Sequence, residues 1–268
     1  MWLLSLLSGF IAPAFIILSP VISYSDQIKD MYRRKSSDGF SLDIPLIMLV
    51  ASMLRIFYYP GAKFDESLLI QSFIMIAIQV LLLKIGLEYR PSPSSKGGEG
   101  ATPFSAGNSG MHRPFNFWKW KSHKKYWQFL LYLFITLTAF EIVLSPMSGL
   151  YSFYSAAIGY IGLSIEAILP VPQLISNFQT KSTKGFRLSI IVSWIGGDIM
   201  KMFWFFTATS EIPWAFKLCG IFQMCCDLGL GAQYLWYRNR HANAGIGLKD
   251  HMSPAVDMLS AYRSNGYA

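Results

Sequence analysis

Long hydrophobic stretches constrain this chain more than any other feature of its sequence. Each is close to the roughly 20 residues that an α-helix needs to cross about 30 Å of hydrocarbon. Only 14% of the residues are charged, which is too few for an ordinary soluble domain. We therefore predict an all-α membrane protein with seven transmembrane helices, at residues 2–24, 41–60, 67–87, 126–144, 149–170, 188–206 and 214–237.

The distribution of positive charge predicts the orientation of the chain. Lys and Arg concentrate in the short cytosolic connections of membrane proteins. Here most of the 23 Lys and Arg residues fall in 25–40, 88–125, 176–187 and the C-terminal tail, whereas the alternate connections carry only Lys63. We therefore expect a lumenal N-terminus and a cytosolic C-terminus. This asymmetry also explains the net charge of +8, so the charge does not indicate a nucleic-acid partner.

The sequence offers no site for the common enzyme chemistries. The histidines lack metal-ligand spacing, and the three cysteines, Cys219, Cys225 and Cys226, lie together in the last hydrophobic stretch. Neither a metal site nor a disulfide framework is expected from them. No GxSxG, Walker A, GxGxxG or HExxH pattern occurs. We therefore predict a protein that is not an enzyme and uses no cofactor.

Three segments outside the hydrophobic stretches have a distinct composition. Residues 91–111 are rich in Pro, Gly and Ser and are predicted to be flexible. Residues 112–121 interleave aromatic and cationic side chains. They suit a segment that lies at an anionic cytosolic leaflet, or they simply lead into the next helix. Residues 241–268 are expected to form a short disordered tail.

An internal repeat divides the membrane part into two halves. A shift of 146 residues aligns Gln27 with Gln173, Lys35-Ser36 with Lys181-Ser182, Gly39-Phe40 with Gly185-Phe186, Arg55 with Lys201 and Phe57 with Phe203. Both copies enter the membrane in the same sense, because each has three spans and a single helix lies between them. We therefore predict two parallel three-helix bundles with the substrate path between them. The predicted parts are the first bundle at 1–90, a cytosolic flexible linker at 91–125, a connecting transmembrane helix at 126–147, the second bundle at 148–240 and the tail at 241–268.

One motif in the second half carries a family resemblance. Glu166-Ala-Ile-Leu-Pro-Val-Pro172-Gln173-Leu174, followed by Lys181-Ser-Thr-Lys-Gly185-Phe186, resembles the motif of PQ-loop repeat proteins. The resemblance implies the fold of PQ-loop transporters, SWEET sugar transporters and the KDEL receptor. Within the family, segments 50–56, 64–84, 194–201 and 219–233 are most similar to the solute carrier family 66 branch, whose fungal counterpart antagonises aminophospholipid flippases. The first repeat departs from the motif, with Asp26-Gln27 in place of Pro-Gln and Pro20 two helical turns earlier.

Prolines at the end of the fifth hydrophobic stretch predict a hinge. Pro170 and Pro172 have no N–H, so carbonyls one turn earlier lose their intrahelical partners and the helix can bend there. Gln173 is expected to donate to the freed carbonyls, and Gln27 to do the same near Pro20 in the first repeat. The alternative is that the two prolines only end a helix at the cytosolic interface.

Charges inside the predicted spans are expected to face protein or water, because a charge in hydrocarbon costs about 2.5–3.5 kcal/mol. Asp198 and Lys201 are three residues apart and can pair on one face of a helix. Arg55 occupies the position equivalent to Lys201, and we expect Asp227 to be its partner. These four residues predict either a functional polar pathway or a structural ion-pair network.

Three functions remain open from the sequence. The resemblance implies an ATP-independent phospholipid scramblase of Golgi or endosomal membranes that acts against aminophospholipid flippases, with Arg55 and Lys201 binding phosphate oxygens. The first alternative is a proton-coupled transporter of amino acids or other small solutes, of the lysosomal or vacuolar type, with Asp198 as the titrating group. The second is a membrane receptor or regulator that transports nothing. The expected partners are phospholipids and the membrane, with a functional link to flippases.

Overall fold

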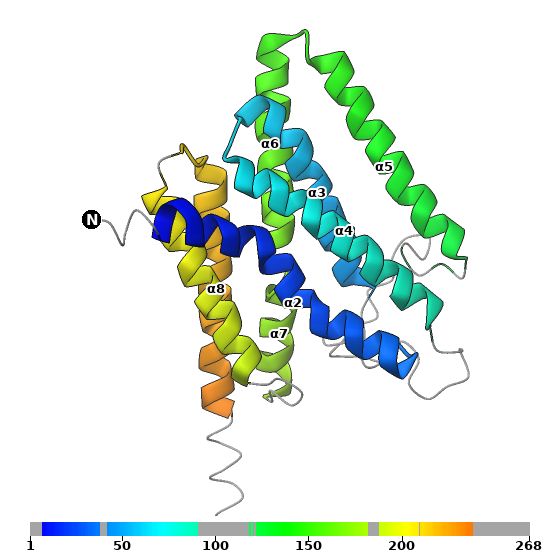
Figure 1. The fold of residues 1–268 in the computed structure, drawn as a ribbon, viewed down its shortest axis with the longest axis vertical. Coiled ribbons are helices and arrows are strands. Elements are labelled where there is room, and N and C mark those ends of the chain that lie inside the picture. Colours follow the sequence, from blue (N-terminus) through cyan, green and yellow to red (C-terminus); the bar gives the residue numbers. More distant parts are fainter. Residues whose placement is uncertain are drawn as a thin grey trace, which may run out of the picture.

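The described part of the chain is built from helices (Figure 1). The computed structural model describes residues 7–37, 42–90, 118, 120, 122–181, 188–208 and 210–237. Its helices are η1 (Leu7–Ile11), α2 (Ala12–Arg34), α3 (Asp43–Ala62), α4 (Glu66–Glu88), α5 (His123–Leu144), α6 (Ser148–Ala167), α7 (Val171–Thr180), α8 (Leu188–Thr207) and a C-terminal helix at Trp214–Tyr237. No strand occurs in these residues, which confirms the all-α fold class.

Within the described residues, six helices are long and apolar enough to cross a membrane. They lie at Gly9–Arg34, Asp43–Ala62, Glu66–Glu88, His123–Leu144, Ser148–Gln179 and Trp214–Tyr237, and the fifth of these spans comprises α6, the turn after it and most of α7. The remaining predicted span, 188–206, coincides with the 20-residue helix α8. Each predicted hydrophobic stretch therefore corresponds to a helix. The largest difference in bounds is in α2, which continues to Arg34, well beyond the predicted end at residue 24.

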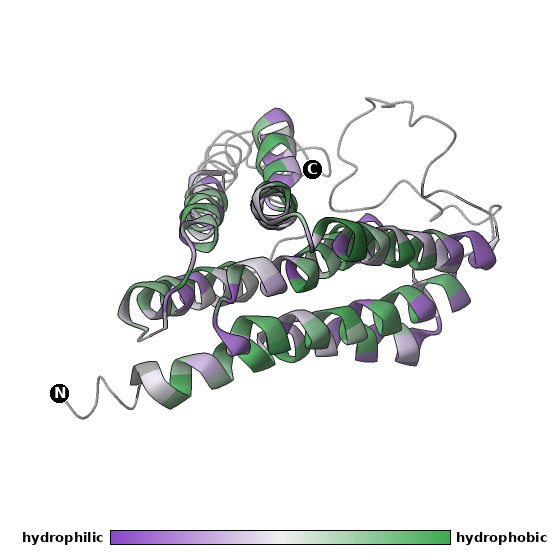
Figure 2. Ribbon diagram, turned by 90° about the horizontal axis from the view of Figure 1, so that it is seen from above, coloured by the Kyte–Doolittle hydropathy of each residue, from purple (hydrophilic) through white to green (hydrophobic). Residues whose placement is uncertain are grey.

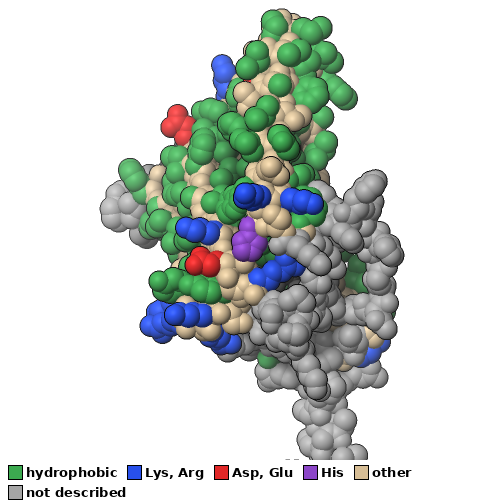
Figure 3. Space-filling model, turned by 90° about the vertical axis from the view of Figure 1, so that its right-hand side faces the viewer, with side chains coloured by type: hydrophobic (Ala, Val, Ile, Leu, Met, Phe, Trp, Pro, Cys, Tyr) green, Lys and Arg blue, Asp and Glu red, His purple; other side chains and the backbone are tan. Residues whose placement is uncertain are grey.

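The helices consist largely of hydrophobic residues (Figure 2), and many of their large apolar side chains are exposed, as expected of helices that face lipid. On α5, Phe134 is 50% exposed and Ile142 is 69% exposed. Hydrophobic side chains cover the upper part of the face seen in Figure 3, whereas Lys, Arg and His side chains gather below them. An apolar band bordered by charge is the pattern expected of helices that span a bilayer.

The helices differ in how extensively they contact one another. α4 packs against both α2 and α3, and α6 lies along α3 in an extensive contact between the two halves. α5 touches α3 and α6 at few points and stands along one side of the molecule (Figure 1). α2 crosses α8 with little contact.

Small residues allow α6 to approach α3 closely. A Cβ added at Gly162 would lie 2.9 Å from Leu54 Cβ and 3.2 Å from the Ala51 carbonyl oxygen. A Cβ added at Gly159 would lie 2.6 Å from the ring of Tyr58. Small residues at helix crossings provide packing energy in membranes, where lipid supplies no hydrophobic driving force between helices. We call this contact the α3–α6 seam.

Two equivalent lysines end their helices in the same conformation. Lys35 closes α2 and Lys181 closes α7, with left-handed φ values of 49° and 51°. The two lysines are separated by the offset of the sequence repeat. Because residues other than glycine seldom adopt positive φ, the shared conformation supports a common backbone path in the two halves.

One carboxylate ties the two halves together at the end where α3 leads into α4. Asp65 Oδ1 accepts a hydrogen bond from the Ser67 N–H at 2.8 Å and so caps α4. Its Oδ2 accepts from the Ser210 hydroxyl at 2.7 Å. Ser210 lies in the connection between α8 and the C-terminal helix. Asp65 therefore joins the connection between α3 and α4 in the first half to the connection between α8 and the C-terminal helix in the second.

The end of the linker packs into the protein and not onto a membrane surface. Trp118 is 1% exposed, and its Nε1 donates to the Leu42 carbonyl at 2.6 Å. The Tyr126 hydroxyl donates to the Trp118 carbonyl at 3.0 Å. The expectation that residues 112–121 lie at an anionic leaflet is therefore wrong for Trp118. Apart from Trp118 and Trp120, that segment lies outside the described residues.

Candidate functional site

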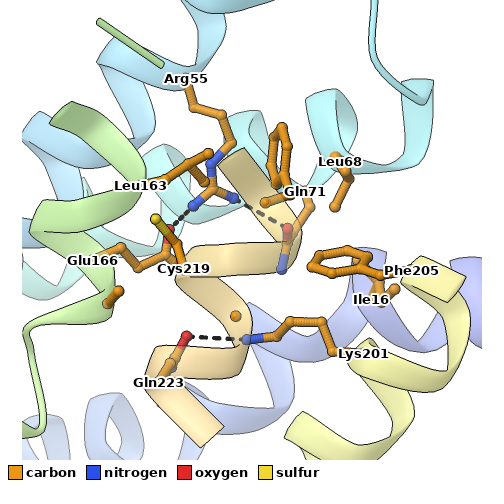
Figure 4. Close-up of a pocket in the computed structure, with 13 residues that line it drawn as sticks. Ile16, Arg55, Leu68, Gln71, Leu163, Glu166, Lys201, Phe205, Cys219 and Gln223 are labelled. Carbon is orange, nitrogen blue, oxygen red and sulfur yellow. Dashed lines mark hydrogen bonds and ion pairs between the residues drawn. The ribbon is translucent and has the colours of Figure 1, made fainter. Parts of the chain in front are cut away.

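A buried ion pair joins the two halves of the molecule. Arg55 on α3 is 5% exposed and pairs with Glu166 on α6. Its Nη1 also donates to Gln71 Oε1 on α4 at 3.2 Å, and Figure 4 shows both contacts converging on the guanidinium. Gln71 Nε2 donates in turn to Ser19 Oγ on α2 at 3.3 Å. The Arg55 cation is therefore neutralised by Glu166 on α6 and held by Gln71 on α4. Gln71 is held in turn by Ser19 on α2.

The structure corrects the expected partner of Arg55. We expected Asp227, but Glu166 makes the ion pair. Glu166 is the only charged residue in the predicted stretch 149–170, and this isolation is the sequence signal that could have found it. A charge in an apolar span needs a partner on a neighbouring helix.

The second cation, Lys201 on α8, is held in a similar way. Its Nζ donates to Asp198 Oδ1 and to Gln223 Oε1 of the C-terminal helix, each at 3.2 Å. The pair expected from the three-residue spacing of Asp198 and Lys201 is therefore present. Asp227 interacts with the Asp198 carboxyl group and lies within electrostatic reach of Lys201. Asp227 thus belongs to the Lys201 group. Each cation has one carboxylate and one glutamine as partners.

Arg55 and Lys201 line the same small cavity between the halves (Figure 4). The cavity has a volume of about 30 Å³, which is room for about one or two water molecules. Its apolar lining includes Ile16, Leu68, Leu163, Phe205 and Phe216. The structure therefore brings together two cations that the repeat places at equivalent positions. It holds them in a closed state that is too small for a phospholipid headgroup.

Several polar atoms of Arg55, Asp198 and Asp227 make no hydrogen bond to the residues that the structure describes. Among the described residues, Arg55 Nε, Asp198 Oδ2 and Asp227 Oδ1 are buried without a hydrogen-bond partner. Asp198 and Asp227 are each 4% exposed. About 90% or more of buried polar atoms in proteins are paired. The group is therefore equipped to bind water or a polar ligand.

The predicted hinge is a break between two helices. α6 ends at Ala167, a turn follows, and α7 begins at Val171 with Pro170 as its N-cap residue. The Leu169 N–H donates to the Glu166 carbonyl at 3.1 Å, so the turn itself satisfies a carbonyl that Pro170 leaves without a partner. Because the chain continues as α7, the prolines interrupt a helix and do not simply end one.

The Pro172-Gln173 dipeptide lies in the first turn of α7. Pro172 is tolerated there because the first N–H groups of a helix have no intrahelical partner. Gln173 is 7% exposed, and its Nε2 donates to Asn177 Oδ1 at 2.7 Å. The expectation that Gln173 donates to freed carbonyls is therefore wrong. Its hydrogen bond stays within α7.

The first repeat has no equivalent break. α2 runs without interruption through Pro20. The Ile16 carbonyl, which Pro20 leaves without an N–H partner, accepts from the Ser19 hydroxyl at 2.8 Å. The expected donor, Gln27, does not serve this carbonyl. Among the described residues, a helix is therefore interrupted at these prolines in the second half but not at Pro20 in the first, in line with the departure of the first repeat from the motif.

Comparison with known proteins assigns the chain to a family. A sequence profile described as PQ loop repeat matches residues 4–68 and 154–214. The chain is 30% identical to Scramblase ANY1 of Saccharomyces cerevisiae over 289 residues, which cover 85% of this chain and 71% of that protein. The chain belongs to the PQ-loop repeat family. In this PQ-loop protein, the Pro-Gln dipeptide of the second repeat is the one at the start of α7.

Two further proteins are similar to this PQ-loop protein in part of the sequence or in fold. The chain is 30% identical to Vacuolar lysine transporter YPQ1 of Saccharomyces cerevisiae over 119 residues, 44% of this chain and 35% of that protein. A eukaryotic SWEET transporter has the same fold, with a TM-score of 0.52 and 14% identity over 87% of this chain and 94% of that chain. The fold agrees with the one implied by the motif.

Proposed function

We propose that this PQ-loop protein moves phospholipids between the two leaflets without ATP. The observation that carries the proposal is the meeting of Arg55 and Lys201 at one cavity inside the helix bundle. Guanidinium and ammonium groups are well suited to bind phosphate oxygens. The similarity to Scramblase ANY1 over most of the chain supports the proposal.

In this mechanism the phosphate takes the place of a carboxylate. In the closed state, Glu166 and Asp198 neutralise the two cations, which offsets the cost of burying them. A phosphodiester carries one negative charge. It can therefore replace either carboxylate beside its cation without leaving that cation unpaired.

The break after α6 provides a way to release Arg55. Glu166 is one residue from the end of α6, and its carbonyl belongs to the turn that leads to Pro170. Bending at this turn reorients the last residues of α6 and moves the Glu166 carboxylate relative to Arg55. The headgroup then passes through the polar interior while the acyl chains remain in lipid.

We further propose that the activity belongs to Golgi or endosomal membranes and opposes aminophospholipid flippases. The basis for the flippase link is the resemblance to the solute carrier family 66 branch. The basis for a lumenal N-terminus and a cytosolic C-terminus is the asymmetry of Lys and Arg between alternate connections.

A second candidate is a proton-coupled transporter of amino acids or other small solutes. The observation that favours it is the contact between Asp198 and Asp227 beside a single cation, Lys201. Two carboxyl groups that face each other can hold a proton between them. The similarity to Vacuolar lysine transporter YPQ1 over 44% of the chain supports this candidate.

A liposome assay separates these functions. The purified full-length protein is reconstituted with a trace of fluorescent phospholipid, and membrane-impermeant dithionite quenches the label in the outer leaflet. We expect the protein to expose inner-leaflet label to dithionite without ATP and without a pH gradient. Quenching of the outer leaflet alone, as in protein-free liposomes, contradicts scrambling. Uptake of a radiolabelled amino acid that requires a proton gradient supports the second candidate, and neither activity supports a receptor or regulator.

The Asp198→Leu/Lys201→Met double variant tests the phosphate-binding role directly. One carboxylate and one ammonium are removed together, so the net charge of their group with Asp227 is unchanged, and thermal unfolding in detergent checks that the variant is folded. We expect scrambling to fall at least about tenfold. Lys217→Met is the matched control, because Lys217 lies over the Trp214 ring and does not line the cavity. Normal scrambling by the folded double variant would assign the pair a structural role only.

A further inference from the structure

The two seams between the halves are equivalent in sequence but unequal in packing. The repeat offset relates α3 to α8 and relates α6 with α7 to α2. The contact between α2 and α8, which we call the α2–α8 seam, is therefore the counterpart of the α3–α6 seam. In the structure the α3–α6 seam is extensive and the α2–α8 seam is slight.

Differences in residue size explain this asymmetry. α6 presents Gly159 and Gly162 to α3, and these glycines leave no room for even a Cβ without a shift. The residues one repeat earlier, on α2, are Pro13 and Ile16. Their larger side chains do not permit an equally close approach to α8. The α2–α8 seam is therefore built to stay more open than its counterpart.

The α2–α8 seam leaves unfilled space beside the second cation. Among the described residues, a Cβ added at Gly196 would meet no atom within 4 Å, and one at Gly197 would meet only Phe15 Cζ at 4.0 Å. Lys201 lies one helical turn from Gly197 on the same side of α8. The Lys201 side chain is 23% exposed, whereas the Arg55 side chain behind the tight seam is 5% exposed.

The residue next to Gly197 in the chain carries a buried polar atom that no hydrogen-bond donor among the described residues reaches. Asp198 follows Gly197 in the chain and is 4% exposed, and its Oδ2 has no hydrogen-bond partner among the described residues. The Asp198 carboxylate and the Lys201 ammonium together match a headgroup that carries both an ammonium and a phosphate.

We propose that the α2–α8 seam is the lateral opening through which a phospholipid enters this protein. Its phosphate reaches Lys201 first and Arg55 second, while its acyl chains stay in the bilayer. Both helices expose apolar side chains suited to acyl chains, including Leu18 at 50% and Ile199 at 58%. The inference rests on the proposed scrambling function and names its entrance. A side opening favours amphiphiles, because a water-soluble solute approaches from the ends of the bundle.

Filling the seam is the first test. Gly197→Leu places a side chain in space that only the tip of the Phe15 ring borders, and leucine favours the helix more than glycine does. Gly149→Leu is the matched control, since a Cβ there also meets no described atom within 4 Å and Gly149 lies at the start of α6. In the dithionite assay we expect Gly197→Leu to slow scrambling at least about tenfold and Gly149→Leu to scramble at the wild-type rate. Equal rates in both variants would overturn the opening.

Cross-linking the seam is the second test. The three cysteines are replaced by serine, and Phe15→Cys/Gly197→Cys is joined by a short reducible thiol cross-linker. Phe15→Cys alone, treated with the same reagent, is the control, because a single thiol cannot bridge the seam. We expect the cross-link to stop scrambling until it is reduced, and the single-cysteine variant to scramble at the same rate with and without the reagent.

The outcomes distinguish the opening from the function on which it rests. Scrambling that survives the Phe15→Cys/Gly197→Cys cross-link overturns the opening and leaves the scrambling function standing. Absence of scrambling in the same protein before cross-linking, and in the wild type, overturns the function and the opening together.

Discussion

Arg55 and Glu166 show how strongly a single pair of side chains constrains a membrane protein. Either charge alone inside the helices would cost about 2.5–3.5 kcal/mol or more. Together they neutralise each other across the boundary between the halves. Each charge offsets the cost of burying the other, and the pair joins the two halves beside the cavity.

Removal of one partner should be far more harmful than removal of both. We expect Glu166→Gln to lower the free energy of unfolding by about 3–5 kcal/mol, because Arg55 is left buried without a counter-charge. Arg55→Met/Glu166→Met should recover most of this loss, since no charge is stranded. Thermal unfolding of each purified variant in detergent measures the difference. Equal destabilisation of the single and double variants would contradict the ion-pair argument.

At the residue scale, local spacing predicted more of the site than distant pairing did. Asp198 and Lys201 are close in sequence, so helix geometry alone predicted their contact. Arg55 and Glu166 lie more than a hundred residues apart, and only the α3–α6 seam brings them together. The choice of Asp227 as the partner of Arg55 failed because sequence gives no measure of which helices adjoin.

At the scale of elements, the break between α6 and α7 is where the second half differs from a regular bundle. The prolines were predicted to let the helix bend, because the missing N–H is a local property of the residue. The structure has a break between α6 and α7 at this point, and the hinge itself stays a prediction. The role of Gln173 was predicted wrongly. Its amide has several acceptors within reach, and the choice of Asn177 depends on side-chain packing.

Restoring the helix at this break should slow scrambling. Pro170→Ala supplies an N–H that can donate to the Glu166 carbonyl, and α6 can then continue into α7. We expect the variant to be at least as stable as the wild type and to scramble about tenfold more slowly in the dithionite assay. Pro60→Ala, at an exposed proline inside α3, is the matched control. An unchanged rate in Pro170→Ala would show that bending at this turn is not needed.

The buried end of the linker should stabilise the first half. Trp118→Ala removes a fully buried indole and its hydrogen bond to the Leu42 carbonyl, which should cost about 3–5 kcal/mol. Trp236 is 67% exposed, and Trp236→Ala should cost less than about 1 kcal/mol. Thermal unfolding compares the two. Similar losses in both variants would mean that Trp118 does not anchor the linker in solution.

At the scale of the whole molecule, the lengths of the hydrophobic stretches and the repeat offset predicted the architecture. Both signals come from physical requirements that act along the whole chain, namely the thickness of the bilayer and the reuse of one backbone path. The burial of Trp118 could not be predicted in this way. An aromatic and cationic segment suits a membrane surface equally well, and only the position of the Leu42 carbonyl distinguishes the two.

The orientation of the chain in the membrane is directly testable. We expect a protease site inserted near residue 100 to be cut when protease is added outside intact organelles, because the charge asymmetry assigns residues 88–125 to the cytosol. A site placed at the N-terminus should be cut only after the membrane is permeabilised. The reverse pattern of cleavage would invert the assigned topology.

The contact between Asp65 and Ser210 has a mechanical consequence. This hydrogen bond joins the two halves at one end, whereas α2 and α8 have little contact along their length. A 20-residue helix is about 30 Å long, and a rotation of about 10° at one end displaces the other by about 5 Å. We therefore expect α2 and α8 to move apart most in the leaflet nearest the basic connections, while α3 and α6 stay packed.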